Sequence, residues 1–306
     1  MHRLLSVLVG AAVLAGTSAE AARSDPTDIG REDGLVTTLV VGGSAVPISD
    51  VPWQAALLNA NRFDRQDDAY FDQFCGAAII SDEWLVTAAH CVDGDTQSNE
   101  VEVVVGKSRL NEMTSADRMQ ISNIFVSPEW NPEDETGDIA LLQLSQRLDL
   151  NGVTVRAISL PTASESAYWP AVGASYTVSG WGCTVPVGID ENVATECEQS
   201  YANELKSVEV VDVSGPSGDV PCGDIGPIPN IAEQIICAGV ASGGQDSCSG
   251  DCGGPLAALL NDEVTLAGVV SSGFGCAQAG YPGFYTRVSA FRSWIDDVTG
   301  GIPATT

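Results

Sequence analysis

The segment Asp246-Ser-Cys-Ser-Gly-Asp-Cys-Gly-Gly-Pro255 has the composition of a loop that presents a nucleophile. Its glycines allow backbone N–H groups to converge beside Cys252, where they can bind the oxyanion that forms when a carbonyl is attacked. A thiol needs less help to ionise than a hydroxyl, and the ionised form is a strong nucleophile. The segment therefore predicts acyl-transfer chemistry centred on Cys252.

A nucleophile of this kind needs a base, and the sequence offers few candidates. His2 and His90 are the only histidines, and His2 lies in a segment typical of an export signal. Imidazole is the side chain whose charge changes closest to neutral pH. We therefore expect His90, in Thr87-Ala-Ala-His90-Cys91, to be the base; a histidine satisfied in the core is the alternative.

Asp138 opens the apolar run Asp138-Ile-Ala-Leu-Leu142. A carboxylate at the start of a buried strand is costly unless it is hydrogen-bonded, and an imidazole N–H is the partner that base catalysis needs. We expect Asp138 to orient His90. An acidic residue before an apolar run is a weak signal alone, because the chain has 41 acidic residues.

The elements that must position these residues are short. Apolar or alternating runs recur from Val40 onward, between breaks rich in Gly, Asn, Asp and Pro. This spacing favours antiparallel strands in a sandwich or barrel. A helical pattern occurs at residues 289–298, where four apolar residues share one face and Gly300 follows as a stop. The expected strands are 54–58, 76–80, 84–87, 102–105, 139–144, 206–213 and 264–271.

These motifs together resemble those of the trypsin-like members of the chymotrypsin family of serine proteases, from Val40 to about Val298. The resemblance implies an all-β fold of two packed, antiparallel, six-stranded β-barrels with a short C-terminal helix. We place the first barrel at about 40–155, the second at about 156–288 and the helix at about 289–298. Further matching segments are Val40-Val-Gly-Gly43, Ser179-Gly-Trp-Gly182, Ile236-Cys-Ala-Gly239 and Tyr281-Pro-Gly-Phe-Tyr-Thr-Arg-Val288.

The resemblance also implies a role for each matching residue. His90 is the base and Asp138 orients it, Cys252 stands where the family has serine, and the N–H groups of Gly250 and Cys252 form the oxyanion hole. Asp246 forms the floor of the primary specificity pocket and favours Arg or Lys, because an uncharged side chain would leave it unpaired. An Asp that caps a turn is the alternative. The pocket walls are Ser271, Gly273 and Gly283.

Two departures from the family pattern bear on activity. Sulfur is larger than oxygen, so Cys252 is crowded against an oxyanion hole shaped for serine, and Ser272 replaces an aromatic platform for the extended substrate. We predict a secreted trypsin-like endopeptidase that cleaves after Arg or Lys by acyl-enzyme chemistry. The alternative is a catalytically weak or inactive secreted homologue that acts as a binding or regulatory protein.

The N-terminus predicts export and processing. A basic start followed by a short apolar run marks residues 1–19 as a signal peptide, and residues 20–39 as a pro-segment before the protease domain at 40–306. The resemblance implies that cleavage before Val40 frees an amine that pairs with Asp251. Because Leu39 is not basic, we expect a different protease to make this cut.

Nine cysteines in an exported chain predict disulfides with one thiol left over. We expect no metal site and no cofactor, since the chain has no Cys-x-x-Cys motif and only two histidines. Cys183 and Cys197 are expected to pair with each other, which leaves Cys252 free; a Cys183–Cys252 bond is the alternative. The pairs implied by the resemblance are Cys75–Cys91, Cys222–Cys237 and Cys248–Cys276.

The net charge of −28 and the pI near 4.1 argue against nucleic acid and anionic membranes as partners. No apolar run after the signal reaches the roughly 18 residues of a membrane helix. We expect protein or peptide substrates that are basic at the cleavage position. The acidic surface serves solubility in one interpretation and attracts basic substrates in the other.

Overall fold

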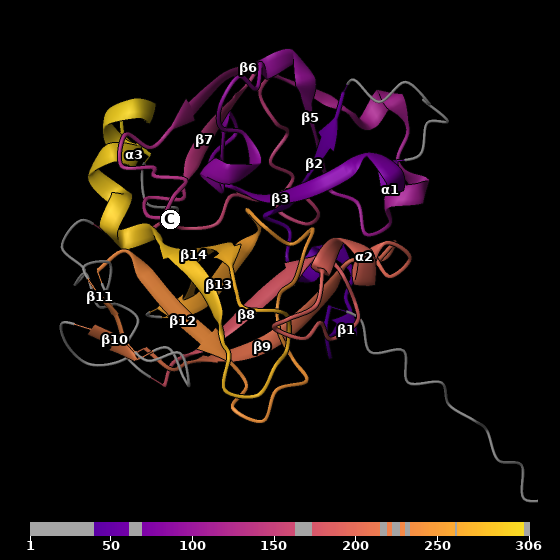
Figure 1. Ribbon diagram of the computed structural model, residues 1–306. Coiled ribbons are helices and arrows are strands. Elements are labelled where there is room, and N and C mark those ends of the chain that lie inside the picture. The colour runs from indigo at the N-terminus through magenta and orange to yellow at the C-terminus, as the bar shows by residue number, and fades with distance from the viewer. Residues whose placement is uncertain are drawn as a thin grey trace, which may run out of the picture. The chain divides into compact units, whose positions relative to one another are not determined.

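The computed structural model describes residues 40–60, 69–162, 173–214, 219–221, 227–229, 233–260 and 262–302. The predicted signal peptide and pro-segment lie outside this part of the chain, and so does Cys222. Within it, the strands form two antiparallel barrels of six strands each (Figure 1). The predicted all-β, two-barrel fold is confirmed.

The first barrel buries both faces of its central strands. In β2, Ala55 and Leu57 point into the barrel, whereas Ala56 and Leu58 join a second core that continues to Val269 of the other barrel. Successive residues of a strand face opposite sides, so β2 contributes to both cores. The closed order is β2 (Gln54–Asn59), β3 (Gln73–Ile79), β4 (Trp84–Thr87), β7 (Ala140–Leu144), β6 (Met119–Val126) and β5 (Val101–Val105).

The second barrel closes because β8 pairs with both β13 and β9. Tyr176 and Val178, two residues apart on β8, point into its interior and pack with Val208 and Val210 of β9. β1 (Ser44–Ala45) also pairs with β9, although it precedes the first barrel in the chain. The closed order is β8 (Ser175–Gly180), β9 (Lys206–Asp212), β12 (Ile235–Gly239), β15 (Gly283–Arg287), β14 (Glu263–Ser272) and β13 (Pro255–Leu260), and β10 (Asp219–Pro221) pairs with β11 (Pro227–Pro229) apart from it.

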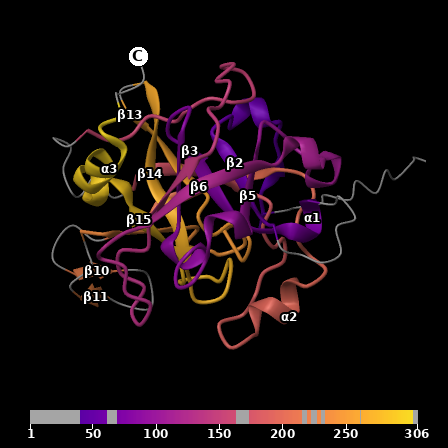
Figure 2. The same cartoon turned by 90° about the horizontal axis from the view of Figure 1, so that it is seen from above.

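The C-terminal helix α3 (Arg292–Thr299) begins after a 3₁₀ turn, so the start of the predicted 289–298 segment is 3₁₀ rather than α-helical. Phe291 and Ile295 are buried, and Gly300 ends the helix with a φ of 77°. α3 and α2 (Val193–Cys197) lie at opposite ends of the barrels in both views (Figures 1 and 2). The other helical segments among the described residues are α1 (Ala69–Asp72) and the 3₁₀ turns Ile48–Asp50, Ala89–Cys91, Ser98–Glu100, Leu110–Glu112, Ser115–Asp117 and Val288–Phe291.

Three of the expected disulfides are present: Cys75–Cys91, Cys183–Cys197 and Cys248–Cys276. Cys237 is also disulfide-bonded, but its expected partner Cys222 lies outside the described residues. Cys252 is free, so the alternative bond to Cys183 is not formed. The Cys75–Cys91 bridge ties the turn that carries His90 to β3, and a bridge of this kind typically contributes about 2–4 kcal/mol.

Candidate active site

His90 and Asp138 are brought together by two neighbouring strands. His90 lies in the 3₁₀ turn after β4, Asp138 lies just before β7, and β4 pairs with β7. His90 Nδ1 lies 2.8 Å from Asp138 Oδ2, and the backbone N–H of His90 donates to Asp138 Oδ1 at 2.9 Å. Both carboxylate oxygens therefore hold the histidine, and Nε2 of its ring is left for another partner.

The second barrel holds the same carboxylate. Asp138 is 1% exposed, and the Ser271 hydroxyl donates to its Oδ2 at 2.6 Å. Thr286 Oγ1 donates to the backbone carbonyl of Asp138, also at 2.6 Å. These bonds cross between the barrels and fix Asp138 relative to β14 and β15. Ser271, expected as a pocket wall, thus also orients the aspartate.

The environment of His90 favours its protonated form. Burial lowers the pKa of His90, but hydrogen bonds to Asp138 and Cys252, together with the negative charges of these two groups, raise it to about 11. The side chain is still 34% exposed, so a substrate can reach it. An imidazole with this pKa carries its proton at neutral pH and can donate it to a leaving group.

We expect His90 to remain protonated between pH 6 and 9, and we expect Cys252→Ala to lower its pKa by removing one hydrogen bond and one charge. An NMR titration of the imidazole measures both values, and a chain cut before Val40 contains no other histidine.

Protonation of His90 stabilises the folded chain, because the pKa of folded His90 lies above the unfolded value near 6.5. The stabilising contribution is complete below pH 6.5 and is lost as the pH rises towards 11. A native His90 that titrates near 6.5 would contradict the charged arrangement.

Cys252 occupies a tight turn just before β13. The Gly76 N–H donates to the Cys252 carbonyl at 2.7 Å, and the thiol is half-buried. Gly253 adopts a φ of 79°, and a Cβ at this position would overlap Thr87 and Gly76. The turn therefore needs glycine after Cys252, and it packs directly against β3 and β4 of the first barrel.

Two backbone donors, the N–H groups of Gly250 and Cys252, lie in the loop that carries the Cys252 thiol. Gly250 has a φ of 91°, and neither its N–H nor that of Cys252 donates to a backbone carbonyl of the described residues. Gln73 Nε2 donates to the Gly250 carbonyl at 2.8 Å and so fixes the next peptide. This pair of donors can bind an oxyanion.

A cavity of about 230 Å³ extends from Cys252 to Asp246. Ser271, Gly273 and Gly283 line it. A Cβ on Gly283 would lie 2.9 Å from Asp246 Oδ1, so glycine is required to keep the floor open. A Cβ on Gly273 would make only ordinary contacts, so a larger residue there would extend a side chain across the cavity.

Asp246 is buried with one oxygen free. It is 3% exposed; the Ala277 N–H donates to Oδ2 at 3.0 Å, and Oδ1 has no partner among the described residues. Burial raises the pKa of Asp246 to about 7, against backbone hydrogen bonds from Ala277 and Ser247 that lower it, and the charge of Asp251 also raises it. An unpaired buried carboxylate is costly, and a cation would offset that cost.

Asp251, five residues after Asp246, is a second buried carboxylate of the same loop. It accepts hydrogen bonds from Gly182 N–H at 2.8 Å and Cys248 N–H at 3.0 Å, while burial raises its pKa to about 7. Val40 is fully buried, and the Val41 carbonyl accepts a hydrogen bond from the Asp246 N–H at 3.1 Å. Val40 and Val41 are thus buried beside the loop that carries Asp246 and Asp251.

Two groups of described residues bring three metal-binding side chains close together, one around His90 and one around Cys248. Every cysteine in them is disulfide-bonded, so no thiolate is available to a metal. Neither group supports a metal site.

Two residues, Gln73 and Ser271, have roles in the site that were not predicted from the sequence. Gln73 is separated by 177 positions from Gly250, and Ser271 by 133 from Asp138. No local pattern marks either contact. Ser272, which was expected to stand in place of an aromatic platform for the extended substrate, lines the cavity.

This fold, with a histidine–aspartate pair opposite a Gly-Asp-Cys-Gly-Gly loop, is the chymotrypsin fold. The family model described as Trypsin matches residues 40–295. The chain is 34% identical to a trypsin of Phaedon cochleariae over 85% of its length and 88% of that protein, and 34% identical to trypsin-1 of Astacus astacus over 84% and 98%. It is 32% identical to trypsin 5G1 of Aedes aegypti over 85% of both chains. The chain belongs to the trypsin family.

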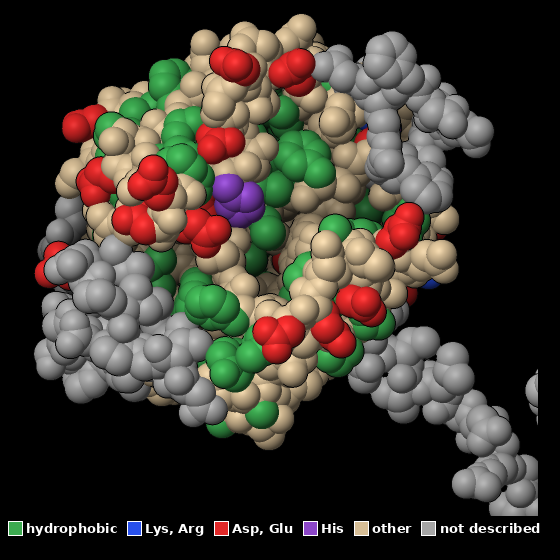
Figure 3. Space-filling view, viewed as in Figure 1, with side chains coloured by type: hydrophobic (Ala, Val, Ile, Leu, Met, Phe, Trp, Pro, Cys, Tyr) green, Lys and Arg blue, Asp and Glu red, His purple; other side chains and the backbone are tan. Residues whose placement is uncertain are grey.

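The face in Figure 3 carries many acidic side chains and few Lys or Arg, in keeping with the net charge of −28. The disulfides agree with an extracellular location. In the part of the chain that the structure describes, no helix is long and apolar enough to span a membrane.

Proposed function

We propose that this chain is a secreted endopeptidase that cleaves peptide bonds after Arg or Lys, with Cys252 as the nucleophile. The observation that carries the proposal is a cavity lined both by the half-buried Cys252 and by the buried Asp246, whose Oδ1 has no partner among the described residues. The side chain of Arg or Lys reaches the floor and brings its own carbonyl to the thiol.

Each residue then has a defined role in the reaction. The sulfur of Cys252 attacks the substrate carbonyl, and the N–H groups of Gly250 and Cys252 stabilise the oxyanion. His90 transfers a proton to the leaving amine, which leaves a thioester on Cys252. A water molecule, deprotonated by His90, hydrolyses the thioester and releases the acid. Asp138 keeps the ring oriented and stabilises its positive charge.

We propose that export and cleavage before Val40 precede activity. None of the ion pairs among the described residues involves Asp251, which is 1% exposed. A new amine at Val40 would supply the missing cation and lower the cost of burying this charge. Because Leu39 is not basic, the cut requires a protease of another specificity.

We expect the chain cut at Leu39–Val40 to hydrolyse an Arg-amide substrate and the uncut chain to be far less active. Iodoacetamide should abolish the hydrolysis, because it alkylates the free thiol of Cys252. The measurement is the amidase rate before and after alkylation, with mass spectrometry to verify the new N-terminus.

No hydrolysis by a chain with a verified Val40 terminus would contradict the proposal. That outcome would favour an inactive homologue that binds basic peptides through the same cavity. Binding of an Arg-containing peptide, measured by calorimetry, would then establish this second function.

A further inference from the structure

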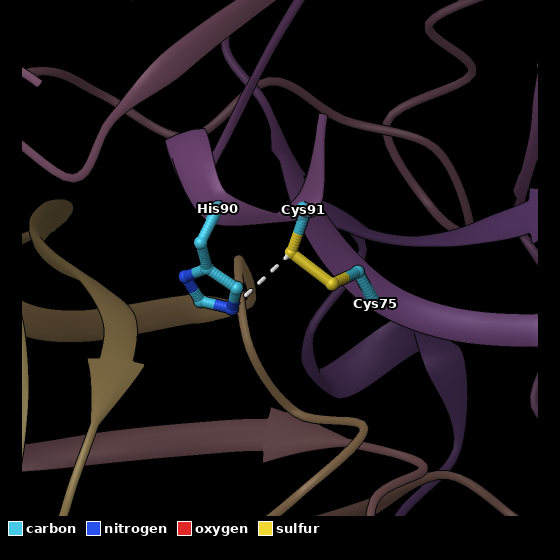
Figure 4. A group of neighbouring side chains, drawn as sticks. All are labelled: Cys75, His90 and Cys91. Atoms are coloured by element: carbon cyan, nitrogen blue, oxygen red, sulfur yellow. Dashed lines mark hydrogen bonds between the residues drawn. A yellow bond between two sulfur atoms is a disulfide. The ribbon is translucent and has the colours of Figure 1, made fainter. Parts of the chain in front are cut away.

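The Cys75–Cys91 disulfide lies beside the His90 imidazole. Cys91 Sγ lies 3.7 Å from His90 Nε2, and the two bridged sulfurs and a ring nitrogen of His90 all lie within 4.8 Å of one another (Figure 4). The Cys252 thiol also lies close enough to His90 to raise the pKa of that imidazole. Nδ1 is bound to Asp138, so Nε2 is the ring nitrogen that faces both Cys252 and the Cys75–Cys91 disulfide.

The other end of the disulfide lies beside Cys252. The residue after Cys75, Gly76, donates its N–H to the Cys252 carbonyl at 2.7 Å. Cys75, Cys91 and Cys252 pack on the same apolar cluster of the first barrel. Cys75 is only 4% exposed, so thiols in solution have little access to it. Cys252 reaches this part of the core from within the protein.

We propose that Cys252 undergoes thiol–disulfide exchange with the Cys75–Cys91 disulfide. The thiolate of Cys252 attacks Cys75 Sγ, and a Cys252–Cys75 bond forms as the Cys75–Cys91 bond breaks. The electron pair of the broken bond leaves on the Cys91 sulfur, which takes the proton from His90 Nε2. One thiol and one disulfide are present before and after the step, so no oxidant or reductant is consumed.

His90 is well placed for this step because the ring that stabilises the attacking thiolate also contacts the departing sulfur. The reverse reaction uses the same residues, with the Cys91 thiolate attacking the new bond. In the exchanged form Cys252 is bonded and cannot attack a peptide. The exchange needs only the three cysteines and His90, so it does not depend on peptide hydrolysis.

The test is disulfide mapping of the full chain, incubated without reductant. Samples are quenched in acid, labelled with N-ethylmaleimide at mildly acidic pH, digested and analysed by mass spectrometry. We expect a second species with the label on Cys91 and a Cys75–Cys252 bond, increasing with time to a constant ratio. His90→Ala should reach that ratio on the order of 100-fold more slowly, because the proton donor is lost.

Cys252→Ser is the matched control and should show no label on Cys91 at any time, since it has no attacking thiol. Label confined to Cys252 in the native chain throughout the incubation would overturn the proposal. Equal labelling of Cys91 in Cys252→Ser would also overturn it, because Cys91 would then be released by another route. An unchanged rate in His90→Ala would overturn the role of His90. An absence of amidase activity bears on none of these results.

Discussion

Replacing Cys252 by serine is expected to raise the amidase activity of the processed chain by about tenfold or more, which corresponds to about 1.4 kcal/mol of barrier. A C–S bond is longer than a C–O bond, and positioning errors of about 1 Å can cost on the order of a hundredfold in rate. The loop cannot shift to accommodate the larger sulfur, because Gly253 packs against Thr87 and Gln73 is hydrogen-bonded to the Gly250 carbonyl. A hydroxyl therefore fits these fixed donors better than a thiol.

In the Cys252→Ser variant, His90 must act as a general base towards the serine hydroxyl. Without the hydrogen bond and charge of Cys252, the pKa of His90 falls, so a larger fraction of the ring is neutral and can act as a base towards the serine hydroxyl. The measurement compares Arg-amide hydrolysis by both processed forms in reductant, which keeps Cys252 as a thiol.

The control is His90→Ala in the Cys252→Ser background, which should remove the gain. No gain in the serine variant would favour an inactive homologue, in which lost substrate contacts such as that at Ser272 limit the rate. A fall in activity would show that the site is adjusted to sulfur and that the crowding argument is wrong.

Local constraints are enough to predict short antiparallel strands and to single out His90, Asp138 and Cys252, whereas the two-barrel arrangement was expected from the resemblance to the chymotrypsin family. Small or apolar residues surround His90 and Asp138, and the loop around Cys252 has no room for a side chain at Gly253. Because these requirements act on neighbouring residues, they appear in the sequence as short motifs. Continuous apolar runs, such as residues 55–58 of β2, similarly predict strands that bury both faces, whereas an alternation of apolar and polar residues predicts one buried face.

The contacts that hold these residues in place were not predictable in the same way. Ser271 reaches Asp138, and Gln73 reaches Gly250, across the junction of the two barrels. The partner of such a polar side chain is over a hundred positions away, so no periodicity or spacing in the sequence indicates the contact. The lack of a hydrogen-bond partner for Asp246 Oδ1 among the described residues was not predictable either, because it depends on the positions of residues distant in the sequence.

Asp246→Asn is expected to lower kcat/KM for Arg and Lys substrates by about 100-fold or more, which corresponds to about 2.7 kcal/mol. The amide keeps the shape of the carboxylate but cannot pair with a cation, which is then buried without a counter-charge. Hydrolysis of a substrate with a neutral residue at the cleavage position should not fall. Asp297→Asn, an exposed substitution on α3, is the matched control because it changes the net charge equally.

The pH dependence provides a second readout of the same carboxylate. The pKa of folded Asp246, about 7, lies above its unfolded value near 3.8, so the cost of its buried charge is absent below pH 3.8 and grows as the pH rises through 7. A cation in the pocket offsets that cost, so an aromatic amidine should bind native protein more tightly at pH 8 than at pH 5. Asp251 also has a pKa of about 7, and the Asn variant separates the two because only the Asp246 part disappears. If Asp246→Asn binds the amidine as tightly as the native chain at pH 8, Asp246 is not the group that selects Arg and Lys.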